Sequence, residues 1–148
     1  MFKYIYYLLP ILCGFTITTQ ASVNSELRHS INNPFAAAFI SFAVGTIVLF
    51  FAVLLVRQGF PSVATLKTLQ WHEYMGGVLG AFFVSAIIYT LPQIGSANMF
   101  VLIIAGQLIT SLAYDHFGVM GAVQQAITWK KMLGVVLVVI GVYIATRK

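Results

Sequence analysis

Polar side chains recur at helical spacing within a stretch that is otherwise apolar enough to lie in a membrane. Gln107, Thr110 and Ser111 share one face of a helix that turns by about 100° per residue, and Asp115 and His116 follow at its end. Carboxamides and hydroxyls hydrogen-bond polar molecules, whereas an Asp–His pair can take up and release a proton. Because polar groups are costly inside a bilayer, the stretch predicts either a polar pathway or a polar packing seam.

A second polar stripe lies near the N-terminus, where Cys13, Thr16, Gln20 and Asn24 recur at steps of three or four residues. For either glutamine alone, helix packing is the stronger interpretation, since such interhelical hydrogen bonds contribute about 0.6 kcal/mol on average. For the two faces together, function is the stronger one, because several polar groups per helix exceed what packing requires. Four side chains are therefore expected to line a substrate pathway: Gln20, Asn24, Gln107 and Ser111.

Asp115 and His116 allow two interpretations that the sequence leaves open. At the negative end of a helix dipole, the pair is a candidate for gating or proton coupling. Alternatively, Asp115 is a solvated loop residue that pairs with Lys130, Lys131 or His116. The choice depends on where the neighbouring helices place these side chains.

The amino-acid composition predicts a membrane protein. Of 148 residues, 60% are hydrophobic and 7% charged, whereas soluble domains carry roughly 25% charged residues. The basic residues lie scattered at the ends of apolar segments and form no patch, which argues against nucleic-acid binding. The single cysteine and three separated histidines provide no metal-ligand spacing, and no nucleophile, phosphate-loop or dinucleotide motif is present. We therefore expect no metal, no cofactor and no enzyme, and rank an intramembrane enzyme using Asp115 and His116 last.

Five apolar segments are long enough to cross a bilayer, which needs about 20 residues of helix. The fold class expected is thus an all-α membrane protein, one domain over 1–148, with spans 3–23, 35–56, 74–91, 96–114 and 132–146. Asn33 should cap the second span, Pro92 should end the third, and Gly118 should follow the fourth helix. A cleaved signal peptide ending near Ala21 is an alternative, but four further spans make a retained first span simpler.

Glycines within the spans predict close helix packing rather than a site. Those expected to contribute are Gly45, Gly76, Gly80, Gly106 and Gly134.

The basic residues favour a cytoplasmic N-terminus, by five against three, although the bias is weak. The N-terminal side would hold Lys3, Arg57, Lys67, Lys130 and Lys131, and the opposite side Arg28, Arg147 and Lys148. A bias this weak also allows insertion in both orientations, which would permit an antiparallel dimer.

Several motifs resemble those of the YdcZ-type inner-membrane exporters of bacteria, over nearly the whole chain. They are Gln20-Ala-Ser-Val-Asn24, Asn33-Pro34, Gly76-Gly77-Val-Leu-Gly80, Pro92-Gln-Ile-Gly95, Ala105-Gly106-Gln107-Leu108 and Asp115-His116-Phe117-Gly118. The resemblance implies the drug/metabolite transporter superfamily, whose EamA-like exporters contain two inverted five-span halves. This chain would be one half, and would pair with itself or a paralogous chain so that substrate passes between protomers.

One departure from that superfamily concerns charge. Its small multidrug resistance proteins carry a carboxylate in the middle of the first span, where this chain has Thr16 and Gln20. Proton-coupled export of cationic drugs by that mechanism is therefore in doubt. We expect a dimeric inner-membrane transporter that exports a small polar metabolite or drug-like molecule by alternating access. The alternative is a non-transporting scaffold subunit of a larger complex.

Overall fold

The computed structural model describes residues 4–56, 59–119 and 124–147. Within them the chain forms six α-helices and the 3-10 helix η2, with no β-strand, which confirms the all-α class. The chain divides into two compact units, Met1–Gln93 and Ile94–Lys148. Each unit is described by itself, and the single membrane domain expected over 1–148 stays a prediction.

Among the residues that the structure describes, four segments are long and apolar enough to cross a membrane: Pro34–Val56, Trp71–Ile94, Ser96–Phe117 and Trp129–Thr146. They correspond to α2, η2 with α4, α5 and α6. Helix α1, Ile5–Ile31, is longer than any of these but is not among them. Its hydroxyl and carboxamide side chains lower its hydropathy, so the fifth span remains a prediction.

Helix α1 extends well beyond the predicted end of the first span. The first membrane span was predicted to end at residue 23, whereas the helix itself continues to Ile31. Glu and Arg are good helix formers, and the helix stops only at Asn32, whose φ of 50° is left-handed. The Asn33 carboxamide oxygen then accepts hydrogen bonds from the amides of Phe35 and Ala36, at 3.0 and 3.1 Å, which confirms the predicted N-cap of α2.

Helix α4, Met75–Ile94, continues through Pro92 instead of ending before it, so the predicted end at 91 was wrong. Proline lacks the amide that would donate to the carbonyl of Ile88, four residues earlier. The guanidinium of Arg28 in α1 donates to that oxygen at 3.3 Å. The helix therefore passes Pro92 with this carbonyl satisfied, and the chain turns at Gly95, whose φ is 79°.

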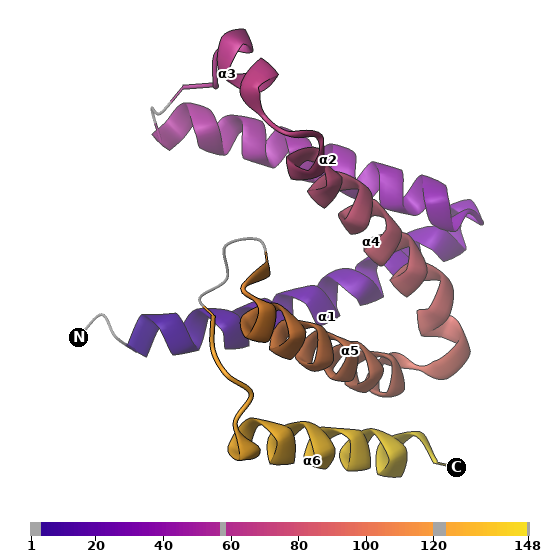
Figure 1. Ribbon diagram of the computed structural model, residues 1–148. Helices are drawn as coiled ribbons and strands as arrows, with labels where there is room; N and C mark the ends of the chain where they lie inside the picture. Colours follow the sequence, from indigo (N-terminus) through magenta and orange to yellow (C-terminus); the bar gives the residue numbers. More distant parts are fainter. Residues whose placement is uncertain (1–3, 57–58, 120–123, 148) are drawn as a thin grey trace. The chain divides into compact units, whose positions relative to one another are not determined.

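The core of the first unit lies where small residues let helices approach. Ala37 and Ala38 at the start of α2 are buried together with Val84 and Ile88 of α4, and Leu27 of α1 packs against them. Figure 1 shows α1 and α2 diverging from their connecting turn, with α4 crossing near that end. Residues of α1 and α2 line the candidate site.

Within the described part of the chain, two short helices lie between α2 and α4. Helix α3, Val63–Thr68, is capped by Ser62, whose hydroxyl accepts from the amide of Thr65. Helix η2, Trp71–Tyr74, has a capping box between Gln70 and Glu73.

The second unit consists of α5, Ser96–Phe117, packed against α6, Trp129–Thr146. Gly118 ends α5 with a left-handed φ of 62°, as its position predicted. Both helices are longer than the predicted spans, because α5 includes Asp115 and His116 and α6 begins at Trp129.

Candidate functional site

A groove between α1 and α2 gathers polar side chains in the first unit, and we call it the α1–α2 groove. Its deeper part is an open pocket of about 210 Å³ that is lined by Gln20, Ser41, Phe42, Gly45, Thr46 and Leu49. Its shallower part, of about 500 Å³, is lined by Phe15, Thr16, Thr19, Gln20, Val23, Asn24 and Ser41. Gln20 and Ser41 border both parts. The groove thus has a mixed wall of carboxamides, hydroxyls and apolar side chains.

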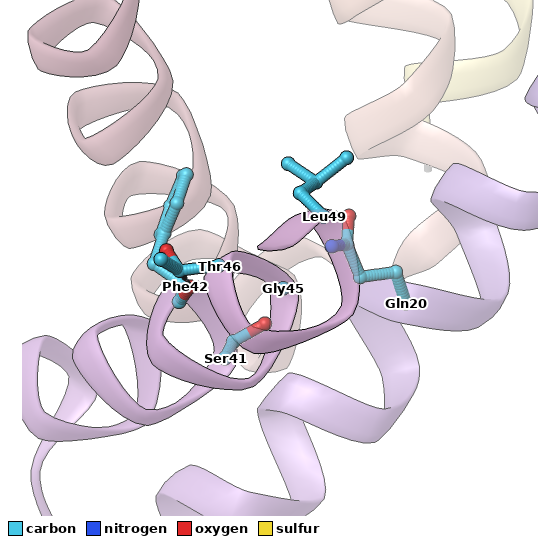
Figure 2. Close-up of a pocket in the computed structure, with 6 residues that line it drawn as sticks. All are labelled: Gln20, Ser41, Phe42, Gly45, Thr46 and Leu49. Atoms are coloured by element: carbon cyan, nitrogen blue, oxygen red, sulfur yellow. Dashed lines mark hydrogen bonds between the residues drawn. The ribbon is translucent and has the colours of Figure 1, made fainter. Parts of the chain in front are cut away.

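The predicted pathway residues Gln20 and Asn24 both belong to this groove. They are four residues apart on α1, so one helical turn stacks them on the same face. Figure 2 shows the Gln20 carboxamide reaching from α1 toward α2, beside Leu49.

Asn24 is the most enclosed polar residue of the groove, with an exposed fraction of 4%. Within the described residues, no hydrogen bond joins its carboxamide to another group, and no polar side-chain atom is both fully buried and unpartnered. The Asn24 carboxamide therefore keeps its access to the groove. An amide in this position is available to a ligand.

The threonine hydroxyls of the groove are already engaged as donors. Thr16 and Thr19 donate to the carbonyls of Leu12 and Phe15 at 2.8 and 2.9 Å, one turn back in α1. Such bonds to the preceding turn satisfy the hydroxyl proton and leave the oxygen free to accept. These threonines therefore contribute acceptors rather than donors.

Gln107 and Ser111, the other two predicted pathway residues, lie on α5 in the second unit. Both are exposed, and the Ser111 hydroxyl donates to the carbonyl of Leu108 at 3.1 Å. Their participation in one pathway with Gln20 and Asn24 stays a prediction.

Asp115 and His116 occupy the last turn of α5, where the chain folds back toward α6. The Asp115 carboxylate forms an ion pair with Lys131 at 3.6 Å, and Lys131 also donates to the side chain of Gln125 at 2.9 Å. The Asp115 side chain is 39% exposed, so the pair is partly solvated. The structure therefore contains the pairing with Lys131 that was one of the two interpretations.

His116 is exposed, and its ring meets that of Phe117 edge-on at 4.9 Å between centroids. The side-chain amide of Gln124 donates to the main-chain oxygen of His116 at 3.2 Å. Through that bond, Gln124 satisfies one of the carbonyls that the end of α5 leaves free.

The five glycines predicted to allow close packing differ in their surroundings. At Gly80, an added Cβ would lie 3.5 Å from the ring of Phe42 in α2. At the other four, no atom of the same unit among the described residues comes within 4 Å of such a carbon; they are Gly45, Gly76, Gly106 and Gly134. Only Gly80 therefore marks a close approach inside a unit.

The roles of two residues, Ser41 and Arg28, were not predicted from the sequence. Ser41 borders both parts of the groove, although it is not among the predicted pathway residues. Arg28 looked like a scattered interfacial cation, yet it donates to a buried residue of α4. The count of basic residues used for orientation also includes Lys3, Arg57 and Lys148, which lie outside the described residues.

Almost the whole chain is similar in sequence to known proteins. A family model described as "Putative inner membrane exporter, YdcZ" matches residues 5–144. The Inner membrane protein YdcZ of Escherichia coli (strain K12) is 28% identical over 139 residues, covering 93% of this chain and 92% of the relative. No solved structure matches.

Proposed function

The chain belongs to the YdcZ family of inner-membrane exporters, and on this basis we propose that it moves a small polar molecule across the bacterial inner membrane. Its apolar helices fit a multi-pass protein of that membrane. Many large side chains on these helices are exposed, as expected where lipid or a second chain covers them. Export is the proposed direction.

The proposed working unit is a dimer of five-span chains, homomeric or formed with a paralogous chain. In this arrangement α1 is the fifth span, and each chain is one half of an EamA-like transporter. Substrate would pass between the halves by alternating access, as in transporters built from inverted repeats. A cytoplasmic N-terminus is part of the same proposal.

One observation carries the proposal: the α1–α2 groove combines two carboxamides, of Gln20 and Asn24, in a chain that is 60% hydrophobic. Polar groups kept in such surroundings are most often functional. Gln107 and Ser111 would extend the hydrogen-bonding surface along the pathway, while Asp115 and His116 would gate it.

The proposal is tested with the purified protein reconstituted into proteoliposomes. Uptake of labelled small polar metabolites should exceed that of protein-free vesicles and should fall to their level with Gln20→Leu. Ser22→Ala is the matched control, because Ser22 lies on α1 outside the groove lining and its hydroxyl donates to the carbonyl of Thr18. If no compound enters faster than in protein-free vesicles, and one unrelated protein co-purifies, the scaffold alternative holds.

Orientation has a separate test. Reporter fusions after the C-terminus should give an external signal if five spans follow a cytoplasmic N-terminus. A purely cytoplasmic signal would contradict that topology, and signals on both sides would support dual insertion.

A further inference from the structure

The α1–α2 groove has no charge of its own. Within the described residues, all side chains that line it are uncharged. An ion entering such a site would lose its hydration without gaining a counter-charge, which costs far more than hydrogen bonds from amides can offset. The groove therefore suits an uncharged molecule.

The free hydrogen-bonding groups of the groove come as donors and acceptors side by side. Gln20 and Asn24 each present an NH₂ next to a carbonyl oxygen, and they lie about 6 Å apart along the axis of α1. Thr16 and Thr19 add acceptors, since their protons are already donated to α1. A ligand group that also holds a donor beside an acceptor can pair with a carboxamide through two hydrogen bonds.

The apolar part of the lining limits the shape of the ligand. Phe42 and Leu49 also line the deeper part, whose volume is about 210 Å³. Figure 2 shows the Gln20 carboxamide beside Leu49 in this part. A compact ring or short apolar body would cover these side chains, while its polar group faces the carboxamides.

We infer that the α1–α2 groove binds an uncharged molecule carrying an amide or lactam group, with Gln20 and Asn24 as its hydrogen-bond partners. The almost completely buried Asn24 carboxamide, which has access to the groove and no internal partner among the described residues, is the observation that points to a ligand. The inference rests on the proposed function for its substrate role and names the class of that substrate.

Matched pairs of small molecules test the class directly. Nicotinamide and benzamide should raise the midpoint of thermal unfolding of the purified protein, followed by tryptophan fluorescence, in a concentration-dependent manner. Nicotinate and benzoate have the same size and shape but carry a charge, and they should leave the midpoint unchanged.

Variants of Gln20 and Asn24 test whether these two side chains bind the ligand. Gln20→Met and Asn24→Leu should each raise the Kd of nicotinamide about tenfold, because each removes hydrogen bonds from the complex. Ser22→Ala should leave this Kd unchanged. Gln20 is exposed, so Gln20→Met keeps the test valid even if Asn24→Leu fails to fold.

The inference is overturned if amides and carboxylates shift the midpoint equally, if neither shifts it at millimolar concentrations, or if Gln20→Met leaves the Kd unchanged. Its failure is separable from that of the transport proposal. Binding of amides through Gln20 without flux into proteoliposomes would refute transport alone. Flux of charged compounds that depends on Gln20 would refute the ligand class alone.

Discussion

Nη1 of Arg28 lies 3.3 Å from the main-chain oxygen of Ile88, the carbonyl that Pro92 leaves without its helical donor. The same guanidinium lies over the ring of Tyr89, 5.9 Å from the centroid. Ile88 is fully buried, so an unsatisfied carbonyl at this position would be costly. The end of α1 and the proline turn of α4 are thus joined by one side chain.

A double-mutant cycle tests this relationship. Arg28→Met should destabilise the protein by about 1.5–3 kcal/mol, the range for hydrogen bonds to charged groups. In a Pro92→Ala background the loss should be smaller, because the new amide at 92 can donate to the Ile88 oxygen. Unfolding of the purified protein in detergent measures both values, and an equal cost in the two backgrounds would contradict the assignment.

Under the proposed function as a dimeric transporter, Gln107→Leu should abolish transport while the yield of folded dimer stays that of the wild type. The reason is that Gln107 is exposed on α5, so a leucine there removes hydrogen-bonding capacity and leaves internal packing alone. Uptake into proteoliposomes and size-exclusion chromatography measure the two quantities. Transport that survives this change would make the polar face of α5 structural.

The ion pair between Asp115 and Lys131 should contribute little to the free energy of unfolding, whereas the gating proposal requires Asp115 for transport. Because their ion pair is partly solvated, Asp115→Asn should change the free energy of unfolding by at most about 1 kcal/mol, and salt should shrink this further. Under the gating proposal, the same variant should nevertheless reduce flux strongly. Normal flux in both Asp115→Asn and His116→Ala would show that this end of α5 is only a connection.

Gly80 is predicted to tolerate a methyl group but no larger side chain. A Cβ there would sit 3.5 Å from the ring of Phe42, an ordinary contact, so Gly80→Ala should be neutral or slightly stabilising. Gly80→Leu should destabilise by about 1–3 kcal/mol through overpacking against α2. Gly76→Leu is the control, since Gly76 has no such neighbour in its unit among the described residues. Equal costs at 76 and 80 would argue against this packing.

Local features of the sequence were sufficient to predict the positions of several helices and some of their ends. Apolar length predicted α2, α5 and α6, because a bilayer-spanning helix needs only hydrophobic residues in sufficient number. Asn33 and Gly118 predicted a helix start and a helix end, since a cap depends on neighbours within a few residues. The spacing of Gln20 and Asn24 placed both on one face of α1 before any partner was known.

Only the tertiary structure decided what faces those residues. Ser41 and Phe42 complete the groove from a second helix, and no pattern within α1 specifies which residues will meet Gln20. Pro92 was predicted to end a helix because its missing amide is a local property, whereas the donor that replaces this amide at the Ile88 carbonyl is Arg28, 60 residues before Ile88 in the chain. A sequence states which hydrogen bond is lost at a proline, but packing decides whether a distant side chain replaces it.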